Sequence, residues 1–144
     1  MTAWLGVVSR AHVQRGVTGD FAQLCHGKAL PLRRMRRGDW LVYYSPSIEL
    51  GGAPLRAFTA LGQVQDDEVF PFDMGGGFVP FRRRVRYLAA REVPLEEVKP
   101  RLELCAPAHW SISLRRGHLP LSNADFRLIA AEMGVRLPRE VDAA

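Results

Sequence analysis

Three strand-like runs separated by proline and glycine constrain the fold of this chain most. Residues 39–45 (DWLVYYS) are rich in aromatic and branched side chains, and residues 55–65 (LRAFTALGQVQ) and 79–89 (VPFRRRVRYLA) alternate as strands do. The segments between them are irregular: acidic residues at 66–68 predict a solvated turn, and FPFDMGGGF at 70–78 excludes regular structure. No regular alternation of strand and helix is present, so a doubly wound sheet is not expected. The pattern predicts a small, partly open barrel with short helices packed outside it.

The remaining elements are predicted from capping residues and short apolar runs. Ser9 is expected to cap a helix at 10–16, and Ser122 a helix at 122–133. Prolines predict helix starts at 31–37 and 94–99. We further expect a strand at 3–9, a bulge at Gly62, and a loop at 102–120 that contains a short strand at 110–114. Residues 1–134 are predicted to form one domain, and 135–144 a C-terminal tail that frays.

The composition excludes several classes of protein. The chain has 144 residues, of which 47% are hydrophobic, so it can bury a core. It contains no apolar run of the roughly 18 residues that a membrane span needs, and its N-terminus lacks the basic region of a signal peptide. We therefore expect a cytoplasmic protein with no membrane partner. Two cysteines and four widely spaced histidines form no metal motif, and no cofactor fingerprint is present, so neither a metal nor a cofactor is expected.

The charge of the chain favours a polyanionic partner. The net charge is +5, the isoelectric point is near 9.9, and all basic residues except Lys28 and Lys99 are arginines. Arginine binds phosphate with two parallel hydrogen bonds and stacks on bases. A high-GC genome would enrich arginine without any such function, so the bias gives only modest support.

The stretch GDFAQLCHGK, residues 19–28, has the composition of a pocket wall. Phe21 offers a flat face, Gln23 and His26 offer directional hydrogen bonds, and the flanking glycines permit close backbone approach. The alternative is a surface loop in which Phe21 and Leu24 fill the core. A second candidate is FVPFRRRVR at 78–86, where aromatic and basic residues adjoin as they do at nucleotide-binding surfaces. Its alternative is a strand with a solvated arginine face.

Cys25 and His26 raise the question of an enzyme. A thiol beside an imidazole could supply a thiolate nucleophile. Neighbouring residues on an extended backbone point to opposite sides, so this pair is a poor catalytic dyad. An enzyme acting on a nucleotide or nucleic acid through Cys25, His26 or His12 remains the alternative to a binding module. A module that binds another protein through its basic face is the third reading.

The order of four sequence motifs indicates a family resemblance. VVSRAHVQRGVTGDFAQLCHGK, LRRMRRGDWLVYYSP, FTALGQVQDDEVFPFDM and FVPFRRRVRYLAAREVPL occur in this order, and the chain resembles the EVE-domain family in its small bacterial stand-alone form over residues 3–133. RRGHLP at 115–120 departs from the aromatic-rich pattern of that family, so no pocket role is assigned to it. The resemblance implies an α+β, PUA-like fold, related to YTH and ASCH modules: a mostly antiparallel, curved β-barrel flanked by short helices.

The resemblance also implies a function and a set of residues. It implies a non-enzymatic module that holds a modified base of DNA or RNA in an aromatic pocket, with phosphates on a basic rim. DNA or RNA, the modification and the oligomeric state stay open, as does which of Tyr43 and Tyr44 faces the pocket. By the motif match, the base would contact Ser9, His12, Phe21, Gln23, His26, Tyr44, Ser45, Phe78, Pro80, Phe81 and Arg82. Phosphates would contact Lys28, Arg33, Arg36 and Arg83.

Overall fold

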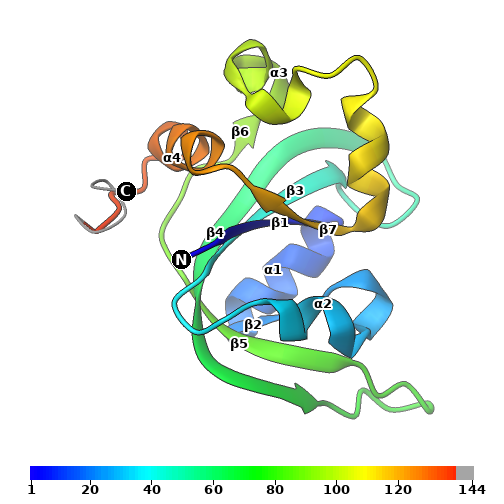
Figure 1. Ribbon diagram of the computed structural model, residues 1–144. Coiled ribbons are helices and arrows are strands. Elements are labelled where there is room, and N and C mark those ends of the chain that lie inside the picture. Colours follow the sequence, from blue (N-terminus) through cyan, green and yellow to red (C-terminus); the bar gives the residue numbers. More distant parts are fainter. Residues whose placement is uncertain (139–144) are drawn as a thin grey trace.

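A single curved sheet forms the framework of the protein (Figure 1). The computed structural model describes residues 1–138, and within them seven strands pair in the order β2-β5-β4-β3-β1-β7, with β6 added on β4. β1 and β3 are parallel, and the other pairs are antiparallel. The strands are β1 Ala3–Val7, β2 Phe21–Ala22, β3 Trp40–Ser47, β4 Pro54–Pro71, β5 Phe81–Tyr87, β6 Val93–Pro94 and β7 His118–Leu121.

The sheet is strongly curved but does not close. β4 is 18 residues long and bends through most of the height of the molecule in Figure 1. β2 and β7 lie at the two ends of the pairing order in the described residues. The predicted α+β class with a curved, mostly antiparallel sheet is confirmed, and the sheet is open in the described residues rather than closed into a barrel.

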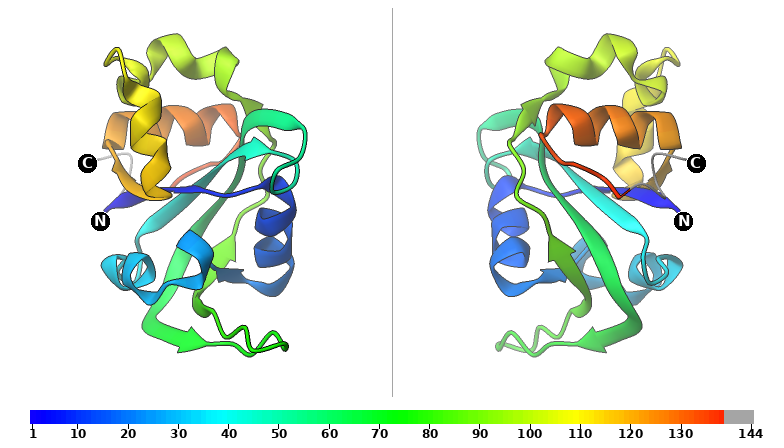
Figure 2. Two further views of the ribbon diagram at one scale, coloured as in Figure 1. Left: turned by 90° about the vertical axis from the view of Figure 1, so that its right-hand side faces the viewer. Right: turned by 90° about the vertical axis from the view of Figure 1, so that its left-hand side faces the viewer.

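Short helices cover the sheet. Figure 2 shows α3 and α4 above α1 and α2 in both views. The predicted caps are confirmed, since the Ser9 and Ser122 hydroxyls accept hydrogen bonds from the backbone N–H groups of His12 and Asp125. No helix in residues 1–138 is long and apolar enough to cross a membrane. The α-helices are α1 Arg10–Gly19, α2 Ala29–Arg34, α3 Leu95–Val98 and α4 Asn123–Glu132, and 3₁₀ turns span Lys99–Arg101, Glu103–Cys105 and Trp110–Arg116.

The alternation along β3 divides the interior into two cores. Trp40, Val42 and Tyr44 pack in the core beneath α3 and α4, whereas Leu41 and Tyr43 pack in the core beneath α1 and α2. Both faces of β3 are therefore buried, which explains why DWLVYYS lacks a polar face. The functional consequence is that Tyr43 and Tyr44 belong to opposite sides of the sheet.

Several local predictions were wrong. The acidic cluster at 66–68 is not a turn: β4 continues through it, with a break in the β5 pairing between Val64 and Val69. Gly62 lies in regular pairing, and the register of the β3–β4 pair shifts between Tyr43 and Tyr44 and again between Ser45 and Ser47. The expected strand at 110–114 is a 3₁₀ turn, and the following residues form β7.

The C-terminal boundary also differs from the expectation. Val135 is buried against the core, and its backbone N–H bonds to the carbonyl of Ala130. Leu137 packs on the same core. Residues 135–137 thus extend the domain, and the rest of the predicted tail from 139 to 144 lies outside the described residues.

Candidate functional site

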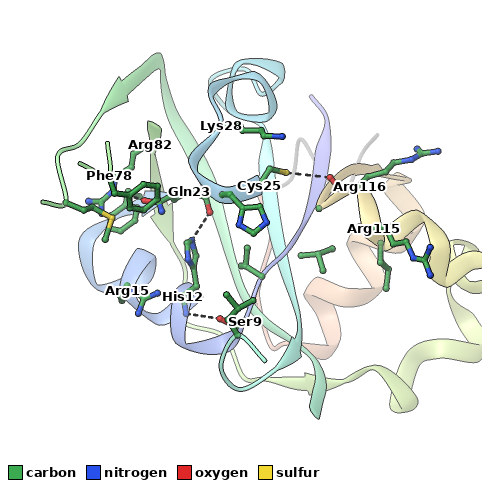
Figure 3. A pocket seen from close by; sticks show the side chains of 18 residues that line it. Ser9, His12, Arg15, Gln23, Cys25, Lys28, Phe78, Arg82, Arg115 and Arg116 are labelled. Atoms are coloured by element: carbon green, nitrogen blue, oxygen red, sulfur yellow. Dashed lines mark hydrogen bonds between the residues drawn. The ribbon is translucent and has the colours of Figure 1, made fainter. Parts of the chain in front are cut away.

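A cavity of about 710 Å³ opens where five segments meet (Figure 3). They are the end of β1 with the start of α1, the segment 21–28, the β3–β4 loop, the β4–β5 connection with the start of β5, and the end of the 3₁₀ turn that precedes β7. Small-molecule sites in proteins have volumes of roughly 300–1,000 Å³. The lining residues are Val7, Val8, Ser9, His12, Arg15, Phe21, Gln23, Cys25, His26, Lys28, Leu50, Met74, Phe78, Arg82, Leu114, Arg115, Arg116 and Gly117.

A left-handed turn presents one wall of the cavity. Cys25, His26 and Gly27 have φ values of 49°, 60° and 83°. The turn is closed by a hydrogen bond of 2.9 Å from the Gly27 N–H to the Leu24 carbonyl. Gly27 packs directly on Pro80 and leaves no room for a Cβ. Left-handed non-glycine residues cost roughly 1–3 kcal/mol each and cluster at ligand-binding sites, so this turn marks the wall as a candidate binding segment.

His12 is held in one tautomer by the backbone of the segment 21–28. Its Nε2 lies 2.8 Å from the carbonyl oxygen of Gln23. A carbonyl only accepts hydrogen bonds, so Nε2 carries the proton and Nδ1 of the neutral ring is an acceptor. Burial lowers the pKa of His12 below 6.5, with the positive charges of Arg15 and Arg82 acting in the same direction and the Gln23 bond opposing them. The ring is therefore mainly neutral at pH 7.

Arg82 contacts the faces of two aromatic rings. Its guanidinium carbon lies 3.8 Å from the ring centroid of Phe21 and 3.8 Å from that of Phe72. Its Nε donates a hydrogen bond of 3.2 Å to Oε1 of Gln23. Phe21 lines the cavity as expected, but one face of its ring is covered by Arg82. The flat face that the sequence indicated is thus used to position an arginine.

The charge of the lining is one-sided. It contains no Asp or Glu but includes Arg15, Lys28, Arg115 and Arg116, which take part in no ion pair within residues 1–138. Acidic residues pair with arginines elsewhere, as Glu132 does with Arg91 and Arg101. Figure 3 shows Arg115 and Arg116 across the cavity from Arg82 and Arg15, with Lys28 at a third side. This distribution favours an anionic ligand.

Eight of the residues predicted for the site do line the cavity. Their side chains come from the start of α1, from the segment 21–28 and from the two sides of the β4–β5 connection. The topology brings these three segments together because β2 pairs with β5. The eight are Ser9, His12, Phe21, Gln23, His26, Lys28, Phe78 and Arg82.

Tyr44 and Ser45 are not in the cavity, contrary to the expectation. Tyr44 is buried in the opposite core, edge-on to Phe58. The Ser45 hydroxyl shares a hydrogen bond of 2.8 Å with that of Thr59. Tyr43 faces the correct side of the sheet but is fully buried, stacked on Tyr87. Neither tyrosine is therefore a wall of the pocket.

Arg83 does not form part of a phosphate-binding rim. It is 1% exposed and donates hydrogen bonds to the carbonyls of Leu32, Met35 and Asp66. Burial lowers its pKa, and the nearby carboxylates of Asp66 and Asp67 oppose that shift. Its donors are committed to the backbone, so its role in the structure is to join α2 to β4 and β5.

The remaining predicted contacts lie beside the cavity. Pro80 is buried under Gly27, and Phe81 packs on the core beneath α1 and α2. Arg33 and Arg36 are exposed near α2 but are not among the lining residues. These four residues support or flank the site.

Cys25 lacks the surroundings of a nucleophile. Its thiol donates a hydrogen bond of 3.5 Å to the carbonyl of Arg116. Burial raises the pKa of the thiol, although Lys28 and Arg34 act in the opposite direction. Gly117 approaches the sulfur so closely that a Cβ there would contact it. The contact joins the left-handed turn to the segment that precedes β7.

Sequence reasoning missed part of the lining. Arg15, Leu50, Met74, Arg115 and Arg116 belong to it. The departure of RRGHLP from the family pattern argued against Arg115 and Arg116, although two adjacent arginines before a glycine are themselves a signal for an anion contact. Leu50 and Met74 lie on loops whose position no local pattern indicates.

Comparisons with known proteins find relatives over nearly the whole chain. UPF0310 protein YdcG of Bacillus subtilis is 43% identical over 136 residues, which cover 93% of each chain. A UPF0310 protein from the gntR 5' region of Bacillus licheniformis is 46% identical over 127 residues, 87% of this chain and 86% of that one. A crystal structure from Agrobacterium tumefaciens shares the fold with a TM-score of 0.61 at 15% identity, covering 96% and 97% of the two chains.

A second solved structure gives the same result. The NMR structure of a Rhodopseudomonas palustris protein has a TM-score of 0.57 at 21% identity, again over 96% of this chain and 97% of that chain. At such identities the likeness concerns the fold alone. The family model described as the EVE domain matches residues 2–132. The chain therefore belongs to the EVE-domain family.

Proposed function

We propose that this protein is a non-enzymatic module that binds nucleic acid and holds one modified base in the cavity. The observation that carries the proposal is the lining: hydrogen-bonding groups surrounded by Arg15, Lys28, Arg115 and Arg116, with no carboxylate among them. A base with its sugar and phosphate needs such a combination of directional groups and positive charge. The EVE-domain family and the PUA-like fold support this assignment.

Apolar side chains at the cavity support entry by an extruded base. Leu50 is 88% exposed, and Met74 and Phe78 are also exposed. They lie on the β3–β4 and β4–β5 loops, and all three line the cavity. Proteins that extrude a base insert apolar side chains into the stack that the base leaves. The three residues are placed to do this while the cationic side chains hold the backbone.

The proposal assigns no chemical step to the protein. The thiol of Cys25 bonds to a backbone carbonyl, and Nε2 of His12 bonds to the carbonyl of Gln23. Neither group is therefore paired with the other as nucleophile and base. A binding role uses the same groups to fix the walls of the cavity.

Replacing Arg115 and Arg116 together with glutamine is expected to weaken binding to every oligonucleotide. Removing one phosphate-binding side chain lowers the slope of log K against log salt by about 0.9 on duplex DNA or about 0.7 on a single strand. Fluorescence anisotropy at roughly 50 to 300 mM salt measures the slope, because salt screens exposed charges strongly over this range.

A matched variant removes the same charge from another face. Arg91→Gln with Arg101→Gln alters two arginines that pair with Glu132 and lie outside the cavity lining. Its salt slope is expected to equal that of the unmodified protein. Equal slopes for both double variants would contradict phosphate binding at this rim, and a salt-independent affinity would favour a protein partner.

A further inference from the structure

We propose that the cavity selects a base that presents two coplanar hydrogen-bond acceptors, and that Arg82 is the residue that determines this specificity. The inference rests on the proposed function and names the ligand class for the same site. Two sources supply such a pair: the O6 and N7 atoms of a guanine-type base, or a carboxylate carried by an oxidised pyrimidine. A methyl group alone supplies none.

The position of Arg82 leaves one end of its guanidinium for a ligand. The side chain belongs to a residue that is only 8% exposed, yet it lines the cavity. Nε is engaged by Gln23, and Nη1 and Nη2 have no further protein partner within residues 1–138. An arginine has five N–H donors, so four remain at this end. Paired N–H groups of this kind bind carboxylates or the O6 and N7 of guanine bidentately.

Two aromatic rings restrict the motion of these donors. The guanidinium carbon of Arg82 lies over the rings of Phe21 and Phe72, 3.8 Å from each centroid. Turning the guanidinium would disturb both contacts. A ligand must therefore offer its acceptors in the same plane, which is the condition that distinguishes a bidentate pair from a single acceptor.

Gln23 extends the row of donors. Its Oε1 accepts from Arg82, which orients the amide so that Nε2 is the remaining polar atom. Its backbone carbonyl is held by His12, and the residue is 6% exposed. Gln23 Nε2 has no hydrogen-bond partner in the described part of the chain. The free N–H groups of Arg82 and of Gln23 Nε2 outnumber the one lone pair that Gln23 Oε1 has left, which favours carbonyl or carboxylate oxygens over the amino groups of adenine and cytosine.

The test uses one oligonucleotide sequence with a single variable position. Guanine, 5-carboxycytosine, 5-methylcytosine and adenine are placed there, and dissociation constants are measured at one salt concentration. We expect guanine or 5-carboxycytosine to bind about tenfold or more tightly than the other two, which is the discrimination of one bidentate pair. Tight binding of 5-carboxycytosine would identify a modified base as the source of the acceptors. Tight binding of guanine would support the acceptor pair but overturn the part of the proposed function that requires a modified base.

Arg82→Lys keeps the positive charge but removes the planar donor pair. The variant is expected to lose about tenfold in discrimination while its affinity for the adenine oligonucleotide is unchanged. Arg86→Lys is the matched control, since Arg86 lies on the same strand, is exposed and is outside the cavity lining. Gln23→Glu, which can still pair with Arg82, provides a second variant if Arg82→Lys unfolds, and it should bind the 5-carboxycytosine oligonucleotide at least tenfold more weakly.

The outcomes separate the two proposals. Equal binding of all four oligonucleotides by the unmodified protein, or full discrimination retained by Arg82→Lys and Gln23→Glu, overturns the acceptor-pair proposal and leaves nucleic-acid binding intact. Tighter binding of 5-methylcytosine than of every other base also overturns it. No binding to any of the four overturns both proposals.

Discussion

Replacing Arg83 with methionine is expected to lower the free energy of unfolding by about 3–5 kcal/mol, the usual cost of breaking a buried ionic network. The side chain is 1% exposed and donates hydrogen bonds of 2.6 Å to the carbonyls of both Leu32 and Met35. It also bonds to the carbonyl of Asp66. Methionine fills a similar volume but leaves these carbonyls without donors. Urea unfolding followed by circular dichroism measures the change.

The neighbouring residue provides the control for this variant. Arg84 is half-exposed and pairs with Asp66 and Glu68 at the surface, both at 3.2 Å. Arg84→Met should therefore leave the free energy of unfolding almost unchanged, because exposed ion pairs contribute little. If the Arg83 variant were as stable as the Arg84 variant and bound nucleic acid more weakly, Arg83 would be a phosphate contact and the structural assignment would be wrong.

A second large effect is expected at His118 on acidification. The ring is 3% exposed and stacks on Trp4 at 4.6 Å, and neither ring nitrogen has a hydrogen-bond partner within residues 1–138. Burial lowers its pKa from 6.5 to about 4, and Arg34 adds to the shift. Between pH 6.5 and about pH 4, His118 therefore binds a proton in the unfolded chain but stays neutral in the folded protein. Stability is lost across that window as the pH falls.

The variant His118→Phe removes this titration and keeps an aromatic ring against Trp4. Its free energy of unfolding should gain about 3 kcal/mol relative to the unmodified protein between pH 7 and pH 4, from the size of the shift. Urea unfolding at half-unit pH steps measures the difference. His109→Phe, at an exposed position, should show no such gain. A constant difference between the His118 variant and the unmodified protein would show that the folded protein binds this proton as readily as the unfolded chain does, which would contradict the lowered pKa.

An element of the fold could be predicted where its sequence pattern is complete within a few neighbouring residues. DWLVYYS and the serine caps were correctly assigned because their patterns are complete within a few residues. The prediction of a turn at the acidic residues 66–68 was wrong because a bulge and a turn can have the same composition. What distinguishes them is Arg83, which bonds to the Asp66 carbonyl from another strand. The 3₁₀ turn at 110–116 likewise depends on packing that the local sequence does not contain.

The candidate site shows the same limit. The contribution of the segment 19–28 was predictable, since its residue types are those of a pocket and its glycines allow the turn. The stacking of Phe21 on Arg82 was not, because the two residues lie far apart in the chain and meet only when β2 pairs with β5. Tyr44 was misplaced because a strand buried on both faces gives no sign of which face meets the cavity.

The most direct test of the account is an NMR titration of the ¹⁵N-labelled protein with the oligonucleotide that binds most tightly in the series above. Binding of the base in the cavity predicts the largest shift changes at the backbone amides of His12, Gln23, His26 and Phe78 and at 115–117. Signals from α4, on the other side of the sheet, should hardly move. Large changes on α3 and α4 with an unchanged cavity would contradict the proposed site.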